Sequence, residues 1–170
     1  AFILSCANIA RPTGGPIDTT PPVFVKSNPK PNQLNFNKNK IEIEFDEIIQ
    51  VDKPTEKVIV SPAQKNMPQI QTSGRKVIVE LQDSLIPNTT YTIDFSDAIS
   101  DNNERNPLYN FSFSFATGNS IDTLQIGGVL LNAENLEPVT GMLVGLHSNL
   151  NDSAFTKTPM QRIAKSDAYG

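Results

Sequence analysis

The stretch from residue 41 to residue 46 alternates strictly between apolar and acidic side chains. Its order is Ile41, Glu42, Ile43, Glu44, Phe45 and Asp46. Alternation with a period of two marks a β-strand with one dry face and one wet face. A strand with a dry face needs a second sheet to cover it. This stretch therefore predicts a fold in which one β-sheet packs against another.

The same alternation returns along the chain, which predicts an all-β fold. We expect strands near residues 23–26, 40–45, 57–61, 69–72, 76–81, 90–95 and 109–116. The 13 prolines lie between the alternating segments, where they mark turns. Seven short strands at this spacing are typical of an immunoglobulin-like β-sandwich, here over residues 21–118. The expected core between the two sheets includes Phe45, Val79, Ile93 and Phe113.

A turn and strand start carry a sharper signal at Leu85, Pro87, Thr89 and Tyr91. Pro87 and the following asparagine make the turn, and Tyr91 begins the next strand with its hydroxyl free to bond a nearby backbone group. The spacing resembles the Leu-x-Pro-x-Thr-x-Tyr stretch of fibronectin type III domains and related bacterial Ig-like domains. We interpret the four residues as a structural motif.

The segment from Asp101 to Leu108 joins the last two expected strands of the sandwich. It resembles the Asp-x-x-Gly-Asn-x-Leu loop of the bacterial Ig-like family first described in surface-layer proteins, with either Arg105 in place of the glycine or a shifted register. Oxygen-rich loops can bind calcium. The spacing is not that of an EF-hand, and Asn and Asp are good turn residues, so a turn is favoured over a calcium site at Asp101–Asn106.

The first residues of the chain predict a membrane anchor. Ile3, Leu4, Ser5 and Cys6 resemble the lipobox of bacterial lipoproteins, which implies that residues 1–5 end a signal peptide and that the Cys6 thiol carries diacylglycerol. Cys6 is the only cysteine, so it cannot form an internal disulfide. Residues 6–20 read as a flexible Pro- and Gly-containing tether, about 50 Å long when extended. The alternative is a short buried first strand with an inert cysteine.

A second β domain is expected over residues 121–170. A strand is predicted at 123–131, and a further alternating segment runs from Met142 to His147. The order Gly-x-Val, Pro-x-x-Gly and an alternating strand resembles the start of carboxypeptidase regulatory-like domains, which implies a second, incomplete β-sandwich. The name of that fold does not imply peptidase activity.

The sequence offers little catalytic chemistry. His147 is the only histidine, and we interpret it as a half-buried strand residue, because zinc sites and acid–base catalysis usually need partners. The net charge of -4 excludes a basic surface for nucleic acid, and the lack of tryptophan leaves few stacking platforms for sugars. The acidic residues at 42, 44, 46 and 47 are interpreted as the wet face and end of an edge strand. We expect no enzyme activity and no cofactor beyond the lipid on Cys6.

The ordered set of motifs from Arg11 to Glu104 resembles the Ig-like-domain lipoproteins of Bacteroidota. That resemblance implies a lipid-anchored protein of the outer membrane, facing either the periplasm or the cell surface. We expect a structural, protein-interaction role in a membrane-associated complex, with a β-barrel protein or its assembly machinery as partner. Two alternatives stay open: a surface polysaccharide-binding lipoprotein, and a spacer for a downstream enzyme domain.

Overall fold

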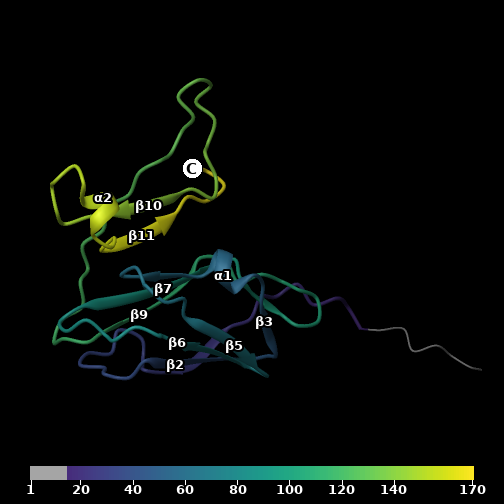
Figure 1. The fold of residues 1–170 in the computed structure, drawn as a ribbon. Helices are drawn as coiled ribbons and strands as arrows, with labels where there is room; N and C mark the ends of the chain where they lie inside the picture. Colours follow the sequence, from purple (N-terminus) through teal and green to yellow (C-terminus); the bar gives the residue numbers. More distant parts are fainter. Residues whose placement is uncertain (1–14) are drawn as a thin grey trace, which may run out of the picture.

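The computed structural model describes residues 15–170, so Cys6 and the first part of the predicted tether lie outside the described residues. The chain forms the predicted all-β sandwich (Figure 1). One sheet has four antiparallel strands in the order β1-β2-β6-β5. Their bounds are β1 Phe24–Asn28, β2 Lys40–Phe45, β6 Lys76–Glu80 and β5 Gln69–Ser73.

The second sheet covers the dry face of the first. Its three antiparallel strands, in the order β4-β7-β9, are β4 Ile59–Ser61, β7 Thr90–Ser96 and β9 Phe111–Ala116. The segment 32–36 lies along the outer edge of β9, where the Asn32 amide donates to the Ser114 carbonyl at 2.8 Å and the Ala116 amide to the Gln33 carbonyl at 2.8 Å. One edge of this sheet is therefore closed by the chain itself.

The predicted core is confirmed between the two sheets. Phe45, Val79, Ile93 and Phe113 are 1%, 0%, 0% and 2% exposed, because the period-2 pattern turns them all inward. Aromatic rings fill the space between the sheets, and Phe45 meets Phe111 edge to face at a centroid distance of 5.5 Å.

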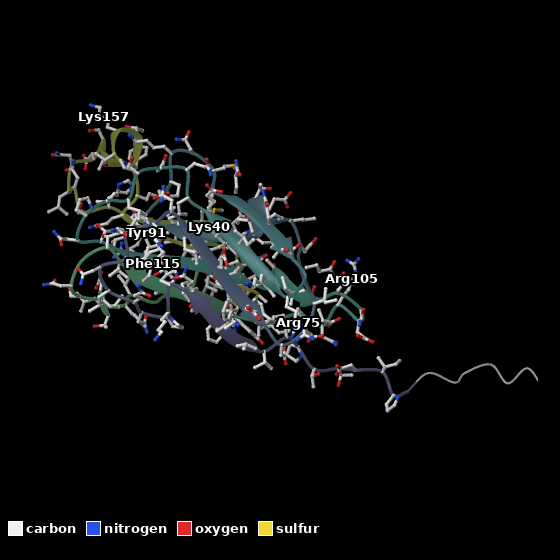
Figure 2. All side chains as sticks on the ribbon, turned by 90° about the horizontal axis from the view of Figure 1, so that it is seen from below. Lys40, Arg75, Tyr91, Arg105, Phe115 and Lys157 are labelled. Carbon is white, nitrogen blue, oxygen red and sulfur yellow. The ribbon has the colours of Figure 1, made fainter. Side chains whose placement is uncertain are left out.

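One prediction about the first sheet is wrong: β2 lies between β1 and β6 and is not an edge strand. The outward carboxylates of β2 form ion pairs with nearby lysines. They do not protect a sheet edge, because β2 is an inner strand. Glu42 lies 2.9 Å from the Lys40 ammonium, and Glu44 lies 3.6 Å from that of Lys76. Figure 2 looks onto this charged outer face, on which Lys40 is labelled.

Three short elements at one end of the sandwich were not predicted. β3 Ile49–Val51 pairs antiparallel with β8 Ile99–Asp101, and the four-residue helix α1 Pro54–Lys57 joins β3 to β4. Each is too short for a periodic signal, and the β3–β8 pair is held by partners distant in sequence. No helix among residues 15–170 is long and apolar enough to cross a membrane.

The C-terminal segment agrees with the prediction only in part, since the alternating segment from Met142 to His147 does form a strand, β10. Residues 123–131 form no strand, so that expectation is wrong. The segment contains a two-stranded antiparallel sheet, β10 Leu143–Leu146 and β11 Arg162–Lys165, joined through the short helix α2 Ala154–Lys157. All four residues of β10 are exposed, because no second layer covers this small sheet within the described residues. Local alternation forms a strand only where a partner strand lies beside it.

Candidate functional site

The tyrosine of the Leu85–Tyr91 motif is buried in the domain. The Tyr91 hydroxyl accepts a hydrogen bond from the Ile86 amide at 2.8 Å, and the residue is 1% exposed. Its ring stacks on Phe115 with centroids 5.3 Å apart, and the two lie side by side in Figure 2. Burial raises the pKa of the Tyr91 hydroxyl, and the Ile86 hydrogen bond partly offsets that rise. This geometry fixes the corner of the sandwich and leaves the hydroxyl no access to solvent.

The other motif residues also bond within the turn. The Thr89 amide donates to the Thr117 hydroxyl at 2.9 Å, and the Thr89 hydroxyl donates to the Pro87 carbonyl at 2.9 Å. Leu85 is partly buried against the core. The motif therefore joins the turn before β7 to the end of β9, which is a structural role.

The loop after β8 is built around one buried carboxylate. Asp101 is 1% exposed, and its Oδ1 accepts hydrogen bonds from the backbone amides of Asn103, Glu104 and Arg105 at 2.8, 2.6 and 3.0 Å. Its Oδ2 accepts from the Asn106 amide at 2.6 Å. Both oxygens are thus taken up by the loop's own backbone, an arrangement that makes a turn.

These bonds control the ionisation of Asp101. Burial alone would raise the pKa of its carboxyl, but the four amide donors outweigh it and hold the pKa below its ordinary value of 3.8. Burial and the neighbouring carboxylates of Asp101 and Asp46 raise the pKa of Glu47. Within residues 15–170 no group of three or more His, Cys, Asp or Glu side chains is arranged to hold a metal ion.

The two chain connections of the sandwich lie at opposite ends (Figure 1). At the Asp101 end, the Asn106 side-chain amide donates to the Asp18 carbonyl at 3.0 Å. At the other end, the chain leaves β9 past Gly118, whose carbonyl accepts from the Asn35 amide at 2.8 Å. The chain therefore enters the domain at one end and leaves it at the other.

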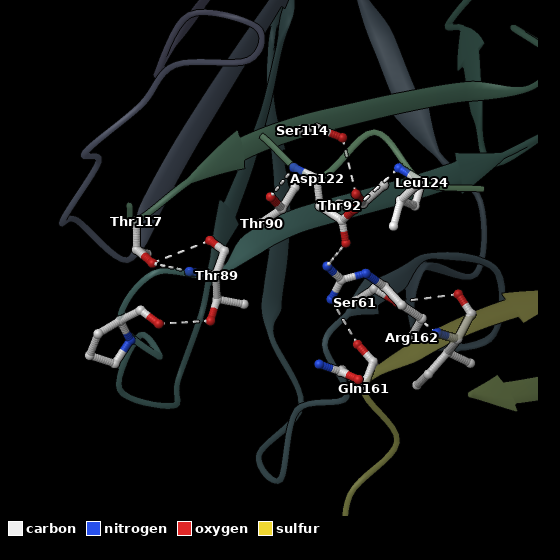
Figure 3. Close-up of polar contacts among 12 residues, drawn as sticks. Ser61, Thr89, Thr90, Thr92, Ser114, Thr117, Asp122, Leu124, Gln161 and Arg162 are labelled. Carbon is white, nitrogen blue, oxygen red and sulfur yellow. Dashed lines mark hydrogen bonds and ion pairs between the residues drawn. The ribbon is translucent and has the colours of Figure 1, made fainter. Parts of the chain in front are cut away.

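The C-terminal segment binds the free edge of the second sheet. The Ser61 hydroxyl on β4 accepts from the Ile163 amide at 2.8 Å and donates to the Ile163 carbonyl at 3.2 Å. Arg162 lies 3.0 Å from the Asp122 carboxylate, and the Asp122 amide donates to the Thr90 hydroxyl at 2.8 Å. Figure 3 shows Ser61, Asp122 and Arg162 together at this junction. β11 thus lies against the edge strand β4 and is attached to it through the Ser61 hydroxyl.

A partly apolar groove of about 320 Å³ lies beside this junction. Its lining includes Met67 and Ile70 from the Ig-like domain and Leu143 and Ile163 from the C-terminal segment. Sequence reasoning missed this junction, because Ser61 carries no local signal that its partner lies in another segment. His147 is half-buried beside β10, with its Nδ1 3.4 Å from the Thr158 hydroxyl. It is the only histidine of the chain, and the only cysteine, Cys6, lies outside the described residues.

Comparison with known families agrees with this geometry. Residues 18–117, more than half of the chain, match the family model of the bacterial Ig-like domain. The chain belongs to the bacterial Ig-like domain family. The match covers both sheets and ends one residue past the Ala116 end of β9. The Ig-like domain therefore accounts for the sandwich, while the C-terminal segment that binds Ser61 and Thr90 at the junction lies outside it.

Solved structures similar to the Ig-like domain are distant. PcoC, a methionine-rich copper resistance protein from Escherichia coli, is 14% identical with a TM-score of 0.41, over 56% of this chain and 96% of PcoC. The N-terminal part of the bacterial S-layer protein SbsC is 17% identical with a TM-score of 0.38, over 88% of this chain and 31% of that one. A search of curated protein sequences finds no match. These likenesses carry no argument about activity.

Proposed function

We propose that this chain is a lipid-anchored protein of the bacterial outer membrane whose Ig-like domain is a non-catalytic, structural module for protein interaction. The observation that carries this proposal is that the chain enters and leaves the domain at opposite ends. The N-terminal segment is held at the Asp101 end, and the C-terminal segment begins at the opposite end. The points at which the chain enters and leaves the domain are therefore separated by the domain's length, while the C-terminal segment folds back against β4 through the Ser61–Ile163 bonds.

The chemistry of the two sequence motifs supports a structural role. The Tyr91 hydroxyl and both Asp101 oxygens accept hydrogen bonds from the protein's own backbone. Groups held in this way define turns and rigid ends, on which loops and strand edges become contact surfaces. The inner faces of the two sheets are used by the core, so partners would bind edges, loops and outer faces.

The proposed membrane anchor is a lipid on Cys6. A thioether-linked diacylglycerol supplies two acyl chains at about 0.8 kcal/mol per buried methylene, enough for stable membrane attachment, where one chain is marginal. The proposed partner is an outer-membrane protein, either a β-barrel protein or the machinery that assembles such barrels. The flexible tether would keep the contact surfaces of the Ig-like domain near the membrane, within the reach of residues 6–20.

Intact-mass analysis of the membrane-extracted protein tests the anchor. We expect a mature chain that begins at Cys6 and carries the mass of the lipid. We expect Cys6→Ser to block lipidation and to leave an uncleaved or mislocalised precursor. Ala7→Ser, next to the modified residue, serves as the matched control and should be processed normally. An unmodified Cys6 with residues 1–5 still attached would refute the anchor.

Affinity purification from detergent-solubilised membranes tests the partner. We expect a stoichiometric outer-membrane protein, identified by mass spectrometry, to accompany the chain and to be lost with Cys6→Ser. A protein that purifies alone from native membranes would contradict the interaction role, whatever the state of its anchor.

A further inference from the structure

Strand β5 is an open edge of the first sheet. It pairs with β6 on one side, and among residues 15–170 no backbone hydrogen bond from another segment reaches its other side. Gln69, Gln71, Thr72 and Ser73 are exposed, and Ile70 is half-buried. An unpaired strand edge presents a row of amides and carbonyls that can pair with another chain.

The remaining edges of the sandwich are closed or protected. Segment 32–36 covers β9, and β11 lies against β4, to which the Ser61–Ile163 bonds attach it. The other edge of the first sheet, β1, has a register shift between Phe24 and Lys26 and carries Lys26 at its centre. A bulge and a lysine are two devices by which proteins prevent pairing between edges. Strand β5 has neither of them.

The strands β1 and β5 also differ in whether each could pair antiparallel with the same strand of a second copy. A two-fold axis at the centre of β1 would set Lys26 against Lys26 of the second copy, and like charges directly opposite each other are destabilising. The same axis at the centre of β5 sets Gln71 against Gln71 and Ile70 against Thr72. The five residues Gln69–Ser73 carry no charge, and Arg75 beyond the turn would face Met67. The β5 edge is thus compatible with its own copy.

We infer that β5 pairs antiparallel with β5 of a second copy of this chain, centred on Gln71. This pairing joins two four-stranded sheets into one continuous sheet across the dimer. It satisfies the outer backbone groups of both edges, sets Gln69 opposite Ser73, and covers the exposed part of Ile70. The dimer goes beyond the proposed function and stands or falls independently of any membrane partner.

Sedimentation velocity of the 170-residue chain over a concentration series tests this pairing, with reductant present to exclude a Cys6 disulfide. We expect a reversible dimer. Gln71→Lys and Gln71→Glu should each raise the dimer dissociation constant by about fivefold or more, since each places like charges opposite each other. An equimolar mixture of the two variants should restore the dimer, because the introduced lysine of one copy then meets the introduced glutamate of the other.

Val25→Lys, an exposed residue on the β1 edge, is the matched control and should leave the dimer unchanged. Circular dichroism should show that the variants at the exposed Gln71 stay folded. A wild-type chain that remains monomeric throughout the series would overturn the inference, as would a dimer that is insensitive to both Gln71 variants. Association of β5 with a different protein only, seen as protection of β5 amides in membrane complexes of a monomeric chain, would also overturn it.

Discussion

Ser61 and Ile163 exchange two hydrogen bonds although 102 positions separate them in the sequence. The serine hydroxyl takes the place of a strand neighbour, since it accepts from the Ile163 amide and donates to the Ile163 carbonyl. The Ala63 amide adds a bond to the Met160 carbonyl at 3.2 Å. The edge strand β4 thereby gains a partner from outside the Ig-like domain, and the C-terminal segment gains a fixed attachment.

Ser61→Ala should loosen this attachment and leave the sandwich folded. The change removes the hydroxyl that satisfies both backbone groups of Ile163, which should cost about 1 kcal/mol, the usual value of such a bond. Hydrogen exchange measured by mass spectrometry should show faster exchange in β11 and unchanged exchange in β2 and β6. Ser112→Ala, at an exposed serine on β9, is the control. Equal exchange of β11 in both variants would contradict the attachment.

Phe113→Ala should strongly destabilise the sandwich. Phe113 is 2% exposed between the sheets, and deletion of a buried aromatic ring typically lowers the free energy of unfolding by about 3–5 kcal/mol. Urea unfolding followed by circular dichroism measures this loss. Tyr109→Ala, at a residue that is 68% exposed, should change the free energy of unfolding little. A loss below about 1 kcal/mol for Phe113→Ala would place that ring at the surface.

The sequence predicts those parts of the fold that depend on local periodicity. Alternation around Ile43 and Val79 determines which side chains face inward, and the structure confirms the core that it predicts. The position of a strand within its sheet depends on distant partners, so β2 was wrongly placed at an edge. For the same reason β3 and β8, which are three residues each, give no signal until they pair.

The candidate site could be predicted only in part. The spacing of the tyrosine motif indicates a corner, and Asp and Asn residues indicate a turn at 101–106. The number of amides that Asp101 accepts depends on the path of the loop, which no residue pattern specifies. The Ser61 junction and the open edge at β5 likewise depend on which segments lie side by side in the folded chain.

Asp101→Asn should destabilise the domain at neutral pH, and the difference should narrow in acid. The pKa of Asp101 in the folded state lies below its ordinary value of 3.8, so the charged form is favoured by folding. Its contribution is complete above pH 3.8 and is lost as the pH falls through the lowered folded pKa. The asparagine also directs a donor at one of the loop amides, an expected cost of about 1–3 kcal/mol.

Urea unfolding at neutral pH and at successively lower pH below 3.8 measures this convergence of the two proteins. Asp152→Asn, at an exposed aspartate, is the matched control and should leave the unfolding curve unchanged at neutral pH. A constant difference between wild type and Asp101→Asn across the acid range would mean that the carboxylate charge does not support the loop.

Arg105→Gly should stabilise the domain. Arg105 has a φ of +66°, in the left-handed region where a Cβ costs about 1–2 kcal/mol, and it stands where the resembling loop has glycine. Glycine removes that strain but loses more entropy on folding, by roughly 0.5–1 kcal/mol. The expected gain is therefore small, about 0.5 kcal/mol, the difference between these two effects. Arg105→Ala separates backbone from side chain, because it keeps the Cβ and should not stabilise. Thermal unfolding of the two variants and the wild type in parallel measures the order of their stabilities. A glycine variant that is no more stable than the alanine variant would contradict the backbone strain at Arg105.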